Sequence, residues 1–367
     1  MTPSPPRRQR ALAPSPPPVA ERLHGALLGL WLGNVMGMAM AGRSFPLLPA
    51  FPKLYEKPPA VGPPKPHPRG HGPALGFAAC GAGCLLQAKQ FQLGTLFKAY
   101  GQYAAFLQKH PQASQLPPEA ALARALEAFP RFFSAEAFLQ HSVRAPVASP
   151  VMDGVLLRSL PAACFFYADS VARVQAVTEE AAASQTGALG AMACVALAAL
   201  VSEAVLSPGE GAPLAKLLEA MHRDMAQAAP RLADMGLRPA AVQQALALLE
   251  EDMAFAPKEC PNLYSPALNL RQHGGQLRPT FRLALWALWH APSSNPGCVI
   301  EDVVRRGGSP ASQGALLAAL CGARWGKGCL PNPGLEPLAP LVAKPPPPCG
   351  DASLLVALAQ VVSPPAR

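Results

Sequence analysis

Acidic side chains are scarce in this chain, which has 22 Asp and Glu among its 367 residues. Only seven of them are Asp, and no acid of either kind occurs between Glu56 and Glu119. A hard divalent cation such as Mg²⁺ needs several carboxylate or carbonyl oxygens around it. The scarcity therefore argues against a metal site built from residues 57–118.

Patterns typical of strands and of zinc sites are also missing. Alternating β-branched residues are rare, whereas Ala and Leu dominate, and this composition favours helices. Cys80 and Cys84 form a CxxxC sequence, but no second Cys/His pair stands at zinc spacing. The nine cysteines are otherwise scattered. We expect buried, reduced thiols and a cytoplasmic location.

The composition is that of a globular protein, with 50% hydrophobic and 14% charged residues. Its net charge of +9 is concentrated at the N-terminus, where residues 1–70 hold nine Lys or Arg and two acids. Because no basic amphipathic helix interleaved with aromatic residues follows, we interpret the charge as a solvated tail. The sequence predicts no nucleic-acid partner.

Proline-rich segments divide the chain. We expect a disordered leader over residues 1–20, one all-α domain over 21–331 with a Pro/Gly-rich loop at 57–73, and a Pro-rich tail over 332–367 with a short terminal helix. Helices are predicted at about 83–109, 117–129, 134–142, 154–183 with a break near Asp169, 186–206, 212–228, 238–254, 280–290, 298–306, 313–325 and 352–362.

Two uncharged stretches resemble membrane or signal segments. Leu23 to Gly42 has no ionisable residue except His24, and Gly187 to Val201 is entirely uncharged. The first carries glycine at positions 25, 29, 33 and 37, which lie along one helix face. Such a stripe suits close backbone packing, and the second stretch is shorter than a bilayer requires. We therefore expect two core helices and no membrane partner.

The turn at Gly307-Gly308 opens a further helix and is followed by Ser309 and Ser312. Free N–H groups at a helix start and a glycine turn suit a metal ion or an anion. A metal would need carboxylates at Ser309 and Ala311, which have a hydroxyl and a methyl group instead. Binding of a phosphate and an ordinary helix N-cap by Ser309 or Ser312 both remain open.

Four segments, in order, resemble the ADP-ribosylglycohydrolase family. Residues 21–37 resemble its Gly-rich opening helix, which ends in Gly-Asp-x-x-Gly, and residues 151–161 resemble its Gly-Asn-Gly-x-x-Met-Arg-x-x-Pro segment. The helix from Ser184-Gln185 resembles one that usually opens with Thr-His. Residues 280–289 with 303–331 resemble the closing segment, which normally contains Gly-Gly-Asp-x-Asp-Thr. The resemblance implies a single-domain, orthogonal all-α bundle with a central cleft.

Active members of the family hold two Mg²⁺ or Mn²⁺ ions and hydrolyse the bond between ADP-ribose and an acceptor. This chain departs from them at the acids. Asn34 replaces the Asp of the opening helix, and Ser309 and Ala311 replace the late acidic pair. The early Asp-Asp-Thr should lie near Gly76 to Cys84, just before a helix at Leu85, and no acid stands there. Conversely, Asp153 stands where Asn is usual, and Gln185 replaces the His.

One carboxylate cannot hold two divalent cations, so we expect the metals, and with them any cofactor, to be lost. The resulting hypothesis is a catalytically degenerate member whose cleft binds ADP-ribose or a nucleotide. Its candidate residues are Asn34, Asp153, Arg158, Gly307, Gly308, Ser309 and Ser312.

Some alternatives remain open. Arg158 could reach a phosphate, pair with Asp153 or pair internally. The protein could also be a hydrolase that uses Asp153 as a lone general base. It could instead be a scaffold that presents Pro-rich segments to a protein partner.

Overall fold

The computed structural model describes residues 17–40, 72–110, 119–147, 150–207, 213–258, 270–292, 294–331 and 353–362. The expected leader up to residue 16, the loop residues 57–71 and the tail at 332–352 lie outside these segments. The expected all-α class is confirmed: within the described segments the only extended pairing is an isolated bridge between Met152 and Gln276.

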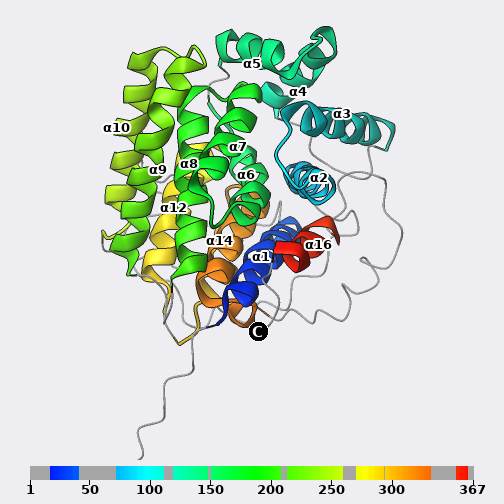
Figure 1. Ribbon diagram of the computed structural model, residues 1–367. Coiled ribbons are helices and arrows are strands. Elements are labelled where there is room, and N and C mark those ends of the chain that lie inside the picture. The colour runs from blue at the N-terminus through cyan, green and yellow to red at the C-terminus, as the bar shows by residue number, and fades with distance from the viewer. Residues whose placement is uncertain are drawn as a thin grey trace, which may run out of the picture.

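The helices follow the predicted order (Figure 1). They are α1 (Val19–Met40), α2 (Pro73–Ala88), α3 (Leu93–Lys109), α4 (Ala120–Ala128), α5 (Ala135–Arg144), α6 (Gly154–Phe165), α7 (Ser170–Ala183), α8 (Gly187–Leu206), α9 (Leu214–Asp234), α10 (Pro239–Phe255), α11 (Leu270–His273), α12 (Leu277–His290), α13 (Cys298–Arg305), α14 (Pro310–Trp325) and α16 (Ser353–Val362), with short 3-10 turns η2 (Phe129–Arg131) and η3 (Lys327–Cys329).

Helix α8 lies at the centre of the bundle. It packs against α6 and α7 and also against α9, α10 and α14. Both α1 and α8 are long and apolar enough to cross a membrane by length and composition, but 89% and 83% of the relevant windows are buried by neighbouring helices. Their apolar character is accounted for by packing inside the bundle.

The glycine stripe of α1 packs directly against α14, as expected from its spacing. A Cβ added to Gly33 would lie 2.0 Å from the carbonyl oxygen of Gly314, and one added to Gly29 would lie 2.3 Å from that of Ala318. Gly25 and Gly37 make the same kind of approach to α14. The two backbones are therefore so close that no side chain fits between them. This contact joins two helices that are far apart in the sequence.

The terminal helix α16 is part of the same bundle. It packs across α1 and α2, where Leu355 and Leu358 are fully buried. In Figure 1 it lies beside α1, although the two helices come from opposite ends of the sequence.

Two predicted boundaries were wrong. Helix α1 starts at Val19, inside the expected leader. The expected helix over 83–109 is two helices, α2 and α3, and residues 76–84 lie inside α2 rather than just before a helix. Pro73 occupies the first turn of α2, where its missing N–H costs nothing. Packing of α2 against α6 and α3 compensates for its several glycines.

A second apolar cluster joins α3, α4 and α5 to α2. It contains the buried rings of Phe77, Phe97, Tyr100 and Phe138, in edge-on or tilted contacts. These helices form one side of the molecule in Figure 1. The cluster fixes the position of the surface formed by α4 and α5.

Candidate functional site

Asn34 joins three elements close to the end of α1. Its side chain is buried, and its amide oxygen accepts a hydrogen bond from the backbone N–H of Gly72 at 2.9 Å. Its amide nitrogen donates to the carbonyl oxygen of Ala311 at 3.3 Å. An Asp at this position could not make the second bond, because a carboxylate is only an acceptor when ionised. Asn34 therefore serves as a link between α1, α2 and α14.

The Gly307-Gly308 turn has the left-handed conformation that glycine favours, with φ of 89° and 82°. Ser309 occupies the N-cap position of α14, but its side chain makes no capping hydrogen bond. Instead its hydroxyl donates to the hydroxyl of Ser312 at 3.3 Å. Of the alternatives that the sequence left open, a cap by the Ser309 side chain is therefore not formed, and the backbone N–H groups of the first turn have no side-chain acceptor from Ser309.

Asp153 lies at the start of α6, where the isolated bridge between Met152 and Gln276 holds it beside the start of α12. Its N–H donates to the carbonyl oxygen of Gly275 at 2.8 Å. Its carboxyl oxygen accepts a hydrogen bond from the hydroxyl of Thr280 at 2.8 Å, and the Ser312 hydroxyl bonds the same carboxyl group. The side chain is 4% exposed. Burial raises the pKa of Asp153 to about 8, and the nearby charge of Glu119 adds to the rise.

Replacing Asp153 with Asn is expected to remove a pH dependence of stability. The pKa of Asp153 in the folded protein lies well above that of an unfolded Asp, so the folded state holds the proton more tightly. Stability is then greatest at low pH and falls as the pH rises towards 8, with a slope of about 1.4 kcal/mol per unit from this group. Urea unfolding at pH 5 and pH 8 measures the slope. An unchanged slope in Asp153→Asn would contradict the assignment.

Arg158 is buried and forms an internal network with two glutamates. Its Nη1 contacts Glu119 at 3.0 Å and its Nε faces Glu180 at 3.6 Å. Glu180 in turn accepts a hydrogen bond from the Tyr100 hydroxyl at 2.6 Å. Burial raises the pKa of Glu180, although Arg158 and Tyr100 act against the rise. The sequence left three interpretations of Arg158 open. The geometry agrees with an internal ion pair, here with Glu119 and Glu180.

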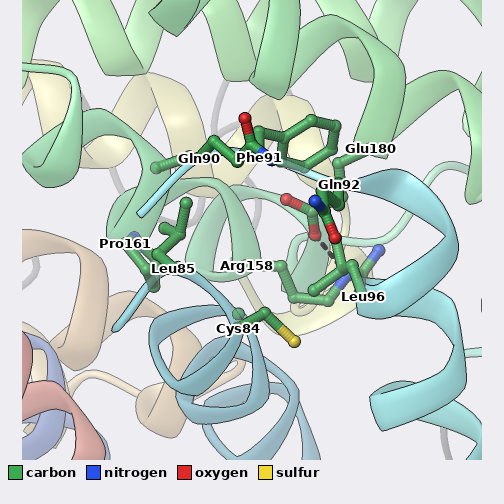
Figure 2. Close-up of a pocket in the computed structure, with 11 residues that line it drawn as sticks. Cys84, Leu85, Gln90, Phe91, Gln92, Leu96, Arg158, Pro161 and Glu180 are labelled. Atoms are coloured by element: carbon green, nitrogen blue, oxygen red, sulfur yellow. Dashed lines mark ion pairs between the residues drawn. The ribbon is translucent and has the colours of Figure 1, made fainter. Parts of the chain in front are cut away.

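The cavity beside Arg158 is small. Figure 2 shows the guanidinium and Glu180 on its wall, with Gln92, Phe91 and Cys84 around it. Its volume is about 10 Å³, which is room for roughly one water molecule. It has no space for a nucleotide.

Gln313 lies one turn into α14 and is 1% exposed. Neither the oxygen nor the nitrogen of its side-chain amide has a hydrogen-bond partner among the described residues. A Cβ added to Gly308 would lie 2.8 Å from this amide nitrogen, so the amide adjoins the glycine turn. A buried amide without partners costs free energy unless a bound molecule completes its bonds. The sequence had no pattern that marked this residue.

The structure thus brings six of the seven predicted site residues to one place. Ser309 and Ser312 bond each other, Ser312 reaches Asp153, Asn34 holds Ala311, and Gly308 adjoins Gln313. Gly307 lies next to them in the chain. Arg158 bonds none of these residues, but its partner Glu119 is close enough to raise the pKa of Asp153. Sequence reasoning missed the partners Thr280 and Glu119, because nothing local marks them as neighbours of Asp153. In the described part of the chain, no group of three or more His, Cys, Asp or Glu could hold a metal ion.

The described part of the chain forms an all-α bundle. This fold is similar to that of a solved structure described as an ADP-ribosylglycohydrolase-related protein complex, with a TM-score of 0.58 over 94% of this chain and 99% of that chain. The two sequences are 20% identical, so the likeness shows a common fold.

The sequence profile of the ADP-ribosylglycohydrolases matches residues 15–361. The chain belongs to the ADP-ribosylglycohydrolase family. The match extends into α16 as far as residue 361, which agrees with the packing of that helix on α1 and α2. No curated protein sequence matches the chain.

Proposed function

We propose that this protein is a non-catalytic ADP-ribosylglycohydrolase that has kept a binding site for ADP-ribose or a nucleotide. The observation that carries the first half is the set of groups around Asp153, which is a single buried carboxyl group. Burial raises its pKa to about 8. Its neighbours Thr280 and Ser312 are hydroxyls. Two divalent cations need several anionic oxygens, and these residues do not fit them.

The surroundings of Asp153 speak against it as a lone general base. A base must be within hydrogen-bond reach of the water from which it takes a proton. The Asp153 side chain is 4% exposed and its carboxyl group is already bonded to the hydroxyls of Thr280 and Ser312, so water has little access to it. The hydrolase alternative therefore has no support from a particular observation, and the Pro-rich segments of the scaffold alternative lie mainly outside the described residues.

The second half of the proposal is supported by the start of α14. The Gly307-Gly308 turn and the first N–H groups of the helix form an environment suited to a phosphate. Ser309 and Ser312 offer hydroxyls, and the unpartnered amide of Gln313 offers both a donor and an acceptor. A ligand with phosphate and hydroxyl groups, such as ADP-ribose or ADP, would satisfy these atoms.

Hydrolysis assays on ADP-ribosyl-arginine and ADP-ribosyl-serine, with Mg²⁺ or Mn²⁺ present, are expected to give no turnover above the blank. ADP-ribose or ADP should raise the melting temperature without metal, and the divalent ions alone should not. A rise that requires the metal, or sustained turnover, would show that the proposal of a non-catalytic protein is wrong.

Gln313→Leu separates binding from folding. Leucine removes two unpartnered polar atoms from a buried position, so the free protein should become more stable. The thermal shift with ADP-ribose should shrink in this variant. Gln102→Leu, on the surface of α3, is the control and should leave the shift unchanged. An undiminished shift in Gln313→Leu would place the ligand elsewhere.

A further inference from the structure

The small cavity beside Arg158 contains a hydrogen-bond donor without an acceptor. The guanidinium group is buried, its Nη1 contacts Glu119, and its Nε faces Glu180. Its Nη2 has no hydrogen-bond partner among the described residues. A buried donor of this kind costs free energy unless an atom in the cavity accepts its hydrogen bond. The volume of about 10 Å³ is enough for one oxygen atom, either of water or of a modified side chain.

A thiol lines the same cavity. Figure 2 shows the side chains of Cys84, near the end of α2, and Arg158 at this cavity. The Cys84 Sγ lies 3.8 Å from the carbonyl oxygen of Thr95, and its side chain is partly exposed. Gln90 and Gln92 also line the cavity and are exposed, so the cavity opens to solvent. A small molecule can therefore reach this sulfur.

The other thiols of the described segments are less suited to reaction. Cys329 is partly exposed, but burial raises its pKa to about 12, so it has almost no thiolate at neutral pH. Because the thiolate is the nucleophile, such a thiol reacts slowly. The remaining five are buried, namely Cys80, Cys164, Cys194, Cys298 and Cys321. Among the described cysteines, Cys84 is thus the one that a small oxidant in solution reaches most easily.

We infer that Cys84 is a site of reversible oxidation, at which hydrogen peroxide converts the thiol to a sulfenic acid that Arg158 stabilises. The sulfur attacks one oxygen of the peroxide, so that an S–O bond forms and the O–O bond breaks. The second oxygen leaves as hydroxide and takes up the thiol proton, which gives water. The sulfur loses two electrons and the peroxide gains them. A thiol can be regenerated from a sulfenic acid, whereas higher oxidation is irreversible.

The cavity accounts for both the extent and the stability of the oxidation. Its volume admits the one oxygen of a sulfenic acid, and it has no room for the several oxygens of a sulfonic acid. The new oxygen accepts a hydrogen bond from Nη2 of Arg158, and hydrogen bonds from a charged donor are stronger than neutral ones. The inference does not rest on the proposed function, because its test follows Cys84 itself and not the binding of a ligand.

The test exposes the full chain to hydrogen peroxide, removes the excess with catalase, and unfolds the protein in dimedone, which bonds to sulfenic acids. Unfolding gives the reagent equal access to every cysteine, and tandem mass spectrometry measures the labelled fraction of each. Label at Cys84 should exceed that at Cys329 by about fivefold or more. Cys80, one turn earlier on α2 and 2% exposed, is the matched control and should stay unlabelled. Label at Cys329 or Cys80 equal to that at Cys84 would overturn the inference.

Gly81→Ala tests the role of the cavity. A Cβ at Gly81 would lie 3.8 Å from Leu96 and 4.0 Å from the Tyr100 hydroxyl, which are ordinary contacts, so the protein should fold. Because Gly81 lines the cavity, the added methyl group takes up room that the oxygen needs. Label at Cys84 should fall about threefold or more. Gly101→Ala, whose Cβ would meet no atom within 4 Å, is the control and should leave the label unchanged.

Arg158→Lys tests the donor. Lysine keeps a positive charge beside Glu119 and Glu180 but has no counterpart of Nη2, so label at Cys84 should also fall. Circular dichroism checks that this variant is folded, and Gly81→Ala tests the inference independently of it. Unchanged label in Gly81→Ala would mean that the cavity holds only water, and it would overturn the inference. An equal fall in Gly101→Ala would overturn it as well.

Discussion

Replacing Gly33 with Leu is expected to abolish folding or to lower the free energy of unfolding by about 3 kcal/mol or more. Even the first side-chain atom would lie 2.0 Å from the carbonyl oxygen of Gly314. The atoms in the way are backbone, so a change of rotamer cannot relieve the clash. Helices α1 and α14 would have to separate, and their buried surfaces would then lose contact with each other.

Gly101→Ala is the matched control for this experiment. Gly101 lies within α3, and a Cβ there would meet no atom within 4 Å. Alanine should therefore stabilise the helix by about 0.5 to 1 kcal/mol. Circular dichroism during urea unfolding measures both variants. If Gly33→Leu unfolded at the same urea concentration as the unmodified protein, the close packing of α1 on α14 would be wrong.

Replacing Arg158 with Met is expected to cost about 3 kcal/mol of stability, because it leaves the buried Glu180 and the largely buried Glu119 without their cation. The loss should depend on pH. Burial already raises the pKa of Glu180, and loss of Arg158 would raise it further. A carboxyl group with a raised pKa destabilises the folded state increasingly as the pH rises, so the loss should be larger at pH 8 than at pH 5.

A second substitution distinguishes lost charge pairing from lost packing. In Arg158→Met/Glu180→Gln the more deeply buried of the two unpaired carboxylates is gone and Glu119 remains. Part of the stability should therefore return, and the extra pH dependence should decrease. Urea unfolding at the two pH values measures this. If the double variant were no more stable than Arg158→Met at pH 8, the destabilisation would come from packing and the charge network would contribute little.

Much of the fold could be predicted because its signals are local. The glycines of α1 lie on one face because of the 3.6-residue helix period alone, so close backbone packing could be predicted, although its partner α14 could not. The Gly307-Gly308 turn was likewise visible, because two adjacent glycines favour the positive φ that they adopt. Most other helices could be predicted because their sequences are long and rich in Ala and Leu, which favour a helix.

The start of α2 could not be predicted in the same way. Glycines at 76, 81 and 83 lower the intrinsic preference for a helix, and Pro73 can be read as the end of a loop. The helix starts at Pro73 because α2 is stabilised by its packing against α6 and α3. A Cβ on Gly76 would lie 2.0 Å from the Tyr103 hydroxyl oxygen, so a small residue is needed where α2 meets α3.

The partners within the site were beyond sequence reasoning for a different reason. Arg158 and Glu119 are 39 residues apart, and Thr280 and Asp153 are 127 apart. No periodicity links positions at such separations. Ser309 and Ala311 could be recognised as lost acids from their motif, but the raised pKa of Asp153 depends on burial that only the folded chain provides.

The joining of α1 to α14 also has a consequence for synthesis on the ribosome. Asn34 and Ala311 are separated by 277 residues. At about 5–20 residues per second, α1 would wait on the order of 15 to 60 s for the helix that covers its glycine face. During that time a long apolar segment near the beginning of the chain is without its partner. The protein should therefore depend on chaperones that shield nascent apolar segments, and more so when elongation is slow.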